Sequence, residues 1–417
     1  MSLPASRKTP GAPPPARLPL LLSRLLALVA VVLATALTGP VPAAHAAVSL
    51  TRVGDFGSNP GALTMYVYRP ASLPEHPAVV VALHGCTQNA QVYADNSGLP
   101  RLADRDGFLL VFAETSTANN PSQCFNWFQS TDNRRGQGEA LSIRQMVSQA
   151  VTAYGADPQR VYVTGLSAGG AMTAVMLATY PDVFSAGAVV AGLPYDCTKD
   201  NSPYTCMNPG VDLGPDTWAQ RVRDAYPSYQ GPWPRAAIWY GDQDTTVVPR
   251  NATELRDQWT ALHGLSQTPT RTTSIGPDAT RQDQYLAADG SVAVEVDRVP
   301  GIGHGTPVDP GTGTAQCGST GAPYFLGSIC SSYWIARFFG LDTSDPGGPG
   351  GSGGGSTAAC WTASNYDQVR AGRATTSGGS TYAKGSQQNM GLYNTFVTHT
   401  LKESPTGYYT IADGGCP

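Results

Sequence analysis

The sequence predicts an α/β protein with a doubly wound, mostly parallel sheet, followed by a small C-terminal unit stapled by a disulfide. Strand-like runs rich in β-branched residues alternate with helical stretches, which indicates a parallel sheet covered by helices on both faces. A tract of Gly, Pro and Ser then separates this long segment from a short tail, which is too small to depend on its core alone.

Seven segments have the composition of buried strands, and three stretches between them have helical spacing. The expected strands are 63–70, 78–85, 107–114, 160–167, 186–192, 236–244 and 292–300, and the expected helices are 139–155, 171–180 and 252–264. In such sheets the chemistry gathers where the strands end, at their carboxyl edge. Residues that follow a strand are therefore the candidates for a site.

The first 46 residues have the pattern of a secretory signal peptide. Four basic residues precede an apolar run that is short for a membrane anchor, and Ala44-His45-Ala46 fits a cleavage site. We therefore expect an extracellular protein with no membrane segment after cleavage. The expected parts are the signal peptide 1–46, a large domain 47–341, a linker 342–356 and a C-terminal module 357–417.

The charge balance argues against a nucleic-acid partner. Without the four basic residues of the leader, 22 Lys and Arg remain against 30 Asp and Glu, so the net charge is near −8. Charged residues make up 13% of the chain, which leaves a surface rich in neutral polar groups. Such a surface can rest on an uncharged solid without strong repulsion.

All eight cysteines follow the leader, and an even number in an exported chain predicts disulfides. Neither CxxC nor HExxH is present, which argues against a zinc site. The expected chemistry, given below, needs no metal and no organic cofactor. The sequence does not determine the connectivity. Pairing between sequence neighbours would join Cys86 to Cys124, Cys197 to Cys206, Cys317 to Cys330 and Cys360 to Cys416.

A nucleophile is expected at Ser167, in the pattern Gly165-Leu166-Ser167-Ala168-Gly169. The pattern lies between an expected strand and an expected helix, which is the context of the nucleophile elbow in α/β-hydrolases. A serine hydroxyl needs a base, and in this fold the order along the chain is serine, acid, histidine.

His304 is the expected base, because the positions of the other five histidines argue against them. It lies on a glycine-flanked loop after the last expected strand, where it can reach over the serine. The other histidines lie in the leader, before the serine, inside an expected helix or in the tail: His45, His76, His84, His263 and His399.

The acid is expected after the strand 236–244, where two aspartates compete. Asp244 begins a loop that returns apolar residues to the core, whereas Asp242 is better suited to bond the backbone of the turn. Asp244 is therefore expected to orient and support the imidazole of His304.

The strand 78–85 ends in His84-Gly85-Cys86, and we expect this loop to complete an oxyanion hole. A tetrahedral ester intermediate carries a negative oxygen that needs fixed N–H donors. The amide of Ala168 would be one donor, and the amide of Cys86, restrained if Cys86 forms a disulfide, would be the other. His84 either holds the loop in place or is only a buried polar residue.

Six segments together resemble the esterase family of extracellular poly(3-hydroxybutyrate) depolymerases, which also includes feruloyl and acetylxylan esterases. They are LHGCTQNA, CFNWF, RRGQGEALSIRQMV, GLSAGGAM, AGLPYDC and GDQDTTVVPRN. The resemblance covers nearly all of residues 50–340. It implies an α/β-hydrolase in which Ser167, Asp244 and His304 form the triad and Cys86 supplies an oxyanion amide.

The tail resembles the C-terminal substrate-binding module of such depolymerases, although similar modules also end some secreted chitinases. Its few charges and several aromatics, among them Trp361 and Tyr393, suit contact with a flat surface, although about half should form its own core. In the large domain Trp127 and Trp233 either line a substrate groove or pack in the core.

The sequence thus predicts a secreted, monomeric serine esterase that hydrolyses poly(3-hydroxybutyrate) or a related short-chain polyester, with insoluble polymer as its partner. The alternative within the family is a feruloyl or acetylxylan esterase whose tail binds polysaccharide. The alternative from another class is a non-catalytic adhesin, against which the complete set of catalytic residues argues.

Overall fold

The computed structural model describes residues 11, 47–342, 360–403 and 409–413. Apart from residue 11, the expected signal peptide lies outside the described residues, as does the expected linker from residue 343 onward. The division into four parts therefore stays a prediction.

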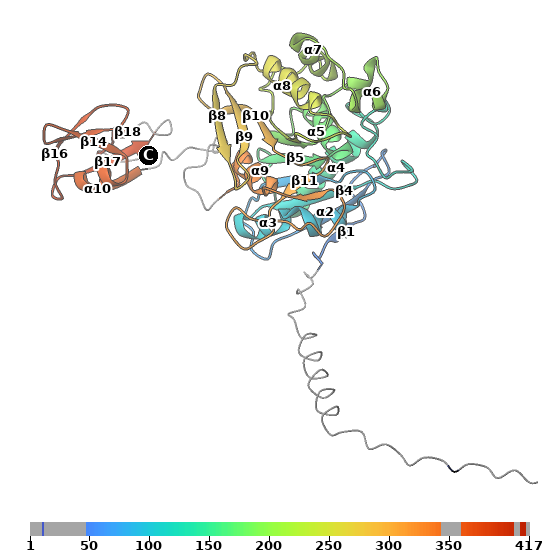
Figure 1. The fold of residues 1–417 in the computed structure, drawn as a ribbon, viewed down its shortest axis with the longest axis horizontal. Coiled ribbons are helices and arrows are strands. Elements are labelled where there is room, and N and C mark those ends of the chain that lie inside the picture. Colours follow the sequence, from blue (N-terminus) through green and yellow to red (C-terminus); the bar gives the residue numbers. More distant parts are fainter. Residues whose placement is uncertain (1–10, 12–46, 343–359, 404–408, 414–417) are drawn as a thin grey trace, which may run out of the picture. The chain divides into compact units, whose positions relative to one another are not determined.

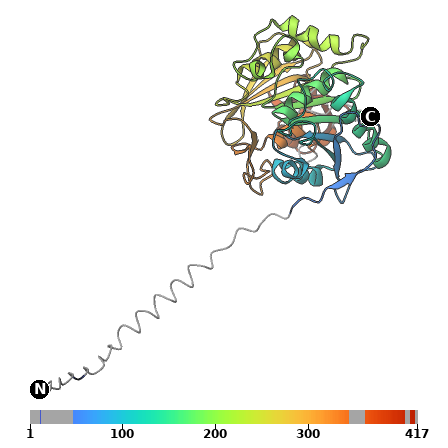
Figure 2. The ribbon, with the colours of Figure 1, turned by 90° about the vertical axis from the view of Figure 1, so that its right-hand side faces the viewer.

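Residues 47–342 are organised around one large sheet (Figures 1 and 2). Its strands, within the described ranges, follow the order β1-β2-β4-β3-β5-β6-β7-β10-β9-β8. The neighbours from β4 to β10 are parallel, and antiparallel strands extend both edges, which confirms the expected fold class. The strands are β1 Thr51–Val53, β2 Thr64–Tyr68, β3 Val79–Leu83, β4 Leu109–Glu114, β5 Val161–Leu166, β6 Ala186–Val190, β7 Arg235–Gly241, β8 Arg271–Ile275, β9 Thr280–Leu286 and β10 Val292–Val299.

Helices cover both faces of this sheet, as Figure 1 shows. One core contains side chains of α4 Gly138–Tyr154, α5 Ala168–Thr179, α7 Pro215–Ala225 and α8 Arg250–Leu262. The other contains side chains of α2 Ala90–Ser97, α3 Leu99–Asp106 and α9 Ser331–Phe339. Shorter elements are η1 Cys197–Lys199, α6 Pro203–Met207, β11 Thr306–Val308 and β12 Phe325–Gly327. None of the helices in the described ranges has the length and apolar character needed to span a membrane.

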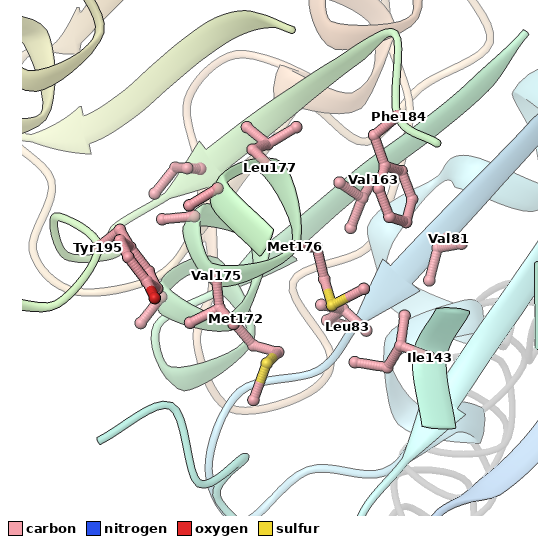
Figure 3. Packing of buried hydrophobic residues seen from close by; sticks show 14 of the residues in the cluster. Val81, Leu83, Ile143, Val163, Met172, Val175, Met176, Leu177, Phe184 and Tyr195 are labelled. Atoms are coloured by element: carbon pink, nitrogen blue, oxygen red, sulfur yellow. The ribbon is translucent and has the colours of Figure 1, made fainter. Parts of the chain in front are cut away.

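The central strand β3 shows why its sequence is a continuous apolar run. Val79, Val81 and Leu83 face the core on the side of α4 and α5, while Val80 and Ala82 face the core on the side of α3 and α9. Figure 3 shows Val81 and Leu83 packed near Ile143 and Met176. Full burial of such a side chain contributes about 1.5–3 kcal/mol, so the strand is held from both faces.

The hairpin of β8 and β9 was not expected, because its residues are polar. Two buried glutamines of β9 pair with acids of β10. Gln282 Nε2 donates to Asp297 Oδ1 at 3.1 Å, and Gln284 Nε2 donates to Glu295 Oε2 at 2.5 Å. Burial raises the pKa of both carboxyl groups.

The C-terminal module contains two small sheets in its described residues. One sheet contains β13 Cys360–Ser364, β17 Thr398–Glu403 and β18 Tyr409–Ile411, and the other contains β14 Ala374–Ser377, β15 Ser380–Ala383 and β16 Asn389–Leu392. The helix α10 Asn365–Arg370 follows β13. The core is small and consists of Ala374, Ala383, Met390 and Leu401.

Candidate active site

Ser167 occupies a sharp turn between β5 and α5. Its backbone has φ 56° and ψ −115°, a conformation that costs free energy in a residue with a side chain and that clusters at functional sites. The N–H of Ser167 donates to the carbonyl of Val190 at 2.9 Å, which ties the turn to the end of β6. The turn thus holds the hydroxyl at the carboxyl edge of the sheet.

The two glycines that flank the serine are required by close packing of backbone against backbone. A Cβ on Gly169 would lie 2.6 Å from the carbonyl oxygen of His84 and would also meet that of Leu83. A Cβ on Gly165 would lie 2.7 Å from the same Leu83 oxygen. The elbow therefore sits directly against the end of β3, where the loop His84-Gly85-Cys86 begins.

Ser167, His304 and Asp244 lie in one hydrogen-bonded line. Nε2 of His304 is 2.8 Å from Oγ of Ser167, and Nδ1 of His304 is 2.7 Å from Oδ2 of Asp244. With the proton on Nδ1, the serine hydroxyl donates to Nε2 and the imidazole donates to the carboxylate. This is the geometry of a nucleophile, a general base and an orienting acid.

The acid is held by the backbone of its own loop after β7. Oδ1 of Asp244 accepts from the N–H groups of Thr246 and Val247, both at 2.9 Å, and its side chain is fully buried. The same loop contacts the histidine loop, since the N–H of Gln243 donates to the carbonyl of Ile302 at 3.0 Å. These contacts bring residues 244 and 304 together although 59 positions separate them in the sequence.

Asp242, the competing candidate acid, has a structural role. Its Oδ1 accepts from the N–H of Gly301 at 2.8 Å, and its Oδ2 pairs with Arg298 at 3.0 Å. The hydrogen bond from Gly301 lowers the pKa of this carboxyl, so it stays ionised. Asp242 therefore fixes the start of the histidine loop without reaching the imidazole.

The remaining described histidines bond elsewhere. His76 contacts the carbonyl of Gly155, His263 contacts that of Pro234, and His399 contacts Asp413 in the C-terminal module.

His84 uses both ring nitrogens to hold the loop that follows β3. Its Nε2 accepts the N–H of Thr115 at 3.3 Å, so Nδ1 carries the proton and donates to the carbonyl of Gly85 at 2.8 Å. Burial lowers the pKa of His84 to about 4, which keeps the ring neutral. The side chain is thus a brace for the loop and not a donor toward the reacting atoms.

Within this loop the N–H of Cys86 is available to donate to an oxyanion, because the neighbouring N–H groups already donate to other acceptors. The N–H of Gly85 donates to Oε1 of Gln88. The N–H of Thr87 donates to the carbonyl of Ser122, and the N–H of Gln88 donates to the carbonyl of Gly85. The N–H of Cys86 donates to no described residue. Ala168 opens α5, where a first-turn N–H has no partner within the helix. Both amides can therefore serve as donors.

A disulfide restrains Cys86, and a buried acid holds the loop that contains its partner cysteine. Cys86 is bonded to Cys124, in a loop whose Asn126 N–H donates to Oε2 of Glu139 at 2.7 Å. Glu139 is buried at the start of α4, and burial raises its pKa to about 8. The sequence interpretation overlooked Glu139 and Gln88, because a single Glu or Gln in a loop or helix carries no pattern that distinguishes it.

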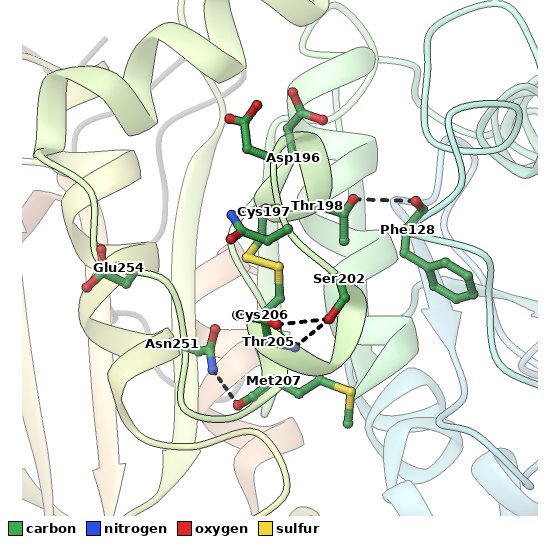
Figure 4. The surroundings of a disulfide bond; sticks show 12 residues. Phe128, Asp196, Cys197, Thr198, Ser202, Thr205, Cys206, Met207, Asn251 and Glu254 are labelled. Atoms are coloured by element: carbon green, nitrogen blue, oxygen red, sulfur yellow. Dashed lines mark hydrogen bonds between the residues drawn. A yellow bond between two sulfur atoms is a disulfide. The ribbon is translucent and has the colours of Figure 1, made fainter.

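Two further disulfides join Cys197 to Cys206 and Cys317 to Cys330. Both follow the expected pairing, while Cys416 lies outside the described residues. Figure 4 shows the Cys197–Cys206 bond beside the cap of α6, where Oγ of Ser202 accepts the N–H of Thr205 at 3.0 Å. This bond closes the segment that leads from β6 toward β7.

The aromatic side chains expected to bind substrate differ in exposure. Trp127 is 7% exposed and packs in the core against Phe128, which makes it a packing residue. Trp233 is half-buried against Tyr229, and Trp361 packs against Tyr409 inside the C-terminal module. Tyr393 is exposed.

Comparison with known proteins identifies the family. The family model described as "Esterase PHB depolymerase" matches residues 61–281. Poly(3-hydroxyalkanoate) depolymerase C of Paucimonas lemoignei is 48% identical over 294 residues, 70% of this chain and 70% of that protein. Acetylxylan esterase of Coprinopsis cinerea is 38% identical over 276 residues, 65% of this chain and 72% of that protein.

A solved structure agrees with these sequence matches. The acetyl xylan esterase from Aspergillus awamori aligns with a TM-score of 0.57 and 32% identity, over 61% of this chain and 94% of that protein. The resemblance inferred from the sequence motifs is confirmed: the chain belongs to the esterase PHB depolymerase family and is a carboxylic ester hydrolase.

Proposed function

We propose that the protein is a secreted serine esterase that hydrolyses poly(3-hydroxybutyrate), or a related short-chain polyhydroxyalkanoate, at the surface of the solid polymer. The observation that carries the catalytic part is the 2.8 Å contact between Oγ of Ser167 and Nε2 of His304. Because Asp244 holds the other ring nitrogen, the imidazole is oriented to take the serine proton.

The first half of the reaction forms an acyl-enzyme. Oγ of Ser167 attacks the ester carbon while its proton moves to Nε2 of His304, and the carbonyl oxygen becomes negative. The N–H groups of Cys86 and Ala168 stabilise this oxygen. The bond to the alcohol oxygen then breaks, and that oxygen leaves with the proton from Nε2.

The second half uses water in place of the serine. Water gives a proton to Nε2 of His304 and attacks the acyl carbon, which forms a second oxyanion against the same amides. The bond to Oγ breaks, Ser167 recovers the proton from Nε2, and the free acid departs. Each half returns the imidazole to its starting state, so one histidine serves both.

Two observations support polymer as the substrate. Poly(3-hydroxyalkanoate) depolymerase C of Paucimonas lemoignei is 48% identical to this chain over 294 residues. The C-terminal module also exposes an aromatic patch, which we define as Tyr366, Leu392, Tyr393 and Phe396. The rings of Tyr366 and Tyr393 lie 5.6 Å apart, and Phe396 is 90% exposed. Exposed apolar groups of this kind suit adsorption to an apolar solid.

Export is supported by the leader pattern and by the disulfides. Three disulfides lie within the described residues, and such bonds persist in oxidising compartments. A solid polymer that lies outside the cell can be reached only by an exported enzyme.

The second candidate is an acetylxylan or feruloyl esterase, which the similarity to the acetylxylan esterases favours. The triad would be unchanged, and the C-terminal module would bind polysaccharide. The two functions differ in the acyl and alcohol groups of the substrate.

One experiment separates these functions. The secreted protein is incubated with a suspension of poly(3-hydroxybutyrate), with acetylated xylan and with feruloylated arabinoxylan, and the released acids are quantified. We expect 3-hydroxybutyrate and its oligomers from the first and far less acetate or ferulate from the others. Preferential release of acetate or ferulate would overturn the polymer assignment. Ser167→Ala should abolish every activity, and retained hydrolysis would overturn the nucleophile.

A further inference from the structure

We propose that Tyr324 contacts the alcohol part of the ester and thereby determines which alcohols the enzyme accepts as leaving groups. The inference deepens the proposed function, because it rests on Ser167 and His304 as nucleophile and base. It assigns a role to a residue that neither the motifs nor the triad account for.

Tyr324 lies against the base of the proposed triad. The centroid of its ring is 6.1 Å from that of His304, and the two planes meet at 74°, an edge-to-face contact. The residue is 41% exposed, whereas the imidazole side chain is 11% exposed. Tyr324 therefore presents open aromatic surface beside a histidine that is nearly covered.

The geometry of the reaction determines which part of the substrate lies beside the ring of Tyr324. The carbonyl oxygen of the substrate must face the amides of Cys86 and Ala168. The alcohol oxygen must approach Nε2 of His304, because it receives its proton there. The part of the substrate that lies beside the imidazole is thus the alcohol part, and the exposed side chain of Tyr324 contacts that ring.

The backbone holds Tyr324 in a strained conformation. Its φ is 67°, in the left-handed region that a bulky residue rarely adopts. The N–H of Thr306 donates to the carbonyl of Tyr324 at 2.7 Å, which fixes this segment to the chain just after His304. Strain that the surrounding contacts maintain is a feature of functional sites.

Gln88 links the same segment to the oxyanion loop. Its Nε2 donates to the carbonyl of Pro323 at 3.0 Å, and its Oε1 accepts the N–H of Gly85 at 2.9 Å. The side chain is 2% exposed; its hydrogen bond with Gly85 is buried, and its hydrogen bond with Pro323 is partly buried. The ring of Tyr324 is thereby held at a set position relative to both the oxyanion donors and the base.

The test varies the alcohol while the acyl group stays constant. Methyl, n-butyl and cyclohexylmethyl butyrate are compared in wild type and Tyr324→Ala, because their alcohols have similar acidity and differ in size. We expect kcat/KM for the two larger esters to fall about ten-fold relative to methyl butyrate, mainly through KM. Tyr324→Phe keeps the ring and should retain the wild-type preference.

Tyr154→Ala is the matched control. Tyr154 is a half-buried tyrosine at the end of α4, at the edge of the sheet opposite to the triad. The next residue, Gly155, contacts His76, which precedes β3. An equal loss on all three esters in Tyr324→Ala would overturn the inference, as would an unchanged preference. Melting temperatures verify that each variant is folded. Activity of Ser167→Ala on methyl butyrate would instead refute the proposed triad, so the two failures are distinguishable.

Discussion

His304 hydrogen-bonds to a carboxylate, that of Asp244, whose orientation does not depend on the histidine. The bond from Nδ1 to Oδ2 is 2.7 Å long, while Oδ1 is occupied by two backbone N–H groups. The acid is therefore oriented before the imidazole binds to it. The fixed carboxylate therefore determines the tautomer of His304, with the proton on Nδ1.

Asp244→Asn should lower kcat by about 10⁴-fold with little effect on stability. The two amides of Thr246 and Val247 require an acceptor, so the asparagine oxygen will face them and its NH₂ will face Nδ1. The imidazole must then carry its proton on Nε2, where it cannot accept from Ser167. The measurement is kcat on a soluble butyrate ester. Asp242→Asn is the control, since that residue bonds to Gly301 and Arg298, and a loss as large as that of Asp244→Asn would contradict the assignment.

Removal of the Cys86–Cys124 bond by the double substitution Cys86→Ala and Cys124→Ala should lower kcat by roughly 10–100-fold. The amide of Cys86 would remain but would lose a covalent restraint on its position. The control is Cys197→Ala with Cys206→Ala, which opens another loop of the same domain. We expect that variant to keep kcat at temperatures where it is folded. Equal kcat losses in both double variants would refute a specific role for the first bond.

Gly169→Ala should reduce both the melting temperature and the activity, because its Cβ would overlap the carbonyls of Leu83 and His84. To relieve the overlap, the elbow or the oxyanion loop must move. Gly54→Ala is a matched change at a glycine with open space around it, and it should be nearly neutral. Thermal melts and ester assays check both. A Gly169→Ala protein as stable and active as wild type would contradict this prediction, because it would mean that a Cβ fits beside the two carbonyls.

Stability should fall as the pH rises from about 4.5 to about 8, in part through Glu139. Burial raises its pKa from 4.5 to about 8, so in this range the folded protein retains a proton that the unfolded chain has lost. Glu139→Gln cannot ionise, and its melting temperature relative to wild type should therefore improve from pH 5 to pH 9. Asp132 also faces this site, because its Oδ1 accepts the N–H of Glu139 at 3.1 Å.

The exposed Glu75 provides the control for this titration. Glu75→Gln should follow the wild-type melting curve at every pH. A melting-temperature difference for Glu139→Gln that stays constant from pH 5 to pH 9 would mean that Glu139 does not titrate in this interval.

Substitution of Tyr393 and Phe396 by Ala should reduce adsorption to solid poly(3-hydroxybutyrate) and leave hydrolysis of soluble esters unchanged. Both rings belong to the aromatic patch of the C-terminal module and are exposed, so their loss removes contact area and not core packing. Depletion of protein from solution over a polymer suspension measures adsorption. Thr376→Ala, at an exposed position of β14, is the control. Unaltered adsorption of the double variant would exclude the patch as the binding face.

The parts of the fold that the sequence predicts are those with strong periodicity. The seven expected strands correspond to β2, β3, β4, β5, β6, β7 and β10, since each is apolar enough to be buried on at least one face. Helices α2 and α3 are eight residues each, too short for a clear pattern, and the second residue of α3 is a proline, which in a sequence suggests a helix breaker. The hairpin of β8 and β9 depends on hydrogen bonds to Glu295 and Asp297, which no local pattern reveals.

The candidate site was predictable where chemistry restricts the choice. Six histidines and one elbow motif left one reasonable base, and His304 lies within hydrogen-bond distance of Ser167. Gln88 and Tyr324 were not identifiable in the same way. Their contacts join residues 88 and 323 and residues 306 and 324, so their importance depends on tertiary geometry and not on residue type.

We expect the disulfide between Cys86 and Cys124 also to determine when the enzyme becomes fully active. In a reducing cytosol Cys86 and Cys124 would stay as thiols, and the loop that bears the oxyanion donor would lack its restraint. Full activity would then appear only in an oxidising compartment, once the two sulfurs have formed their bond.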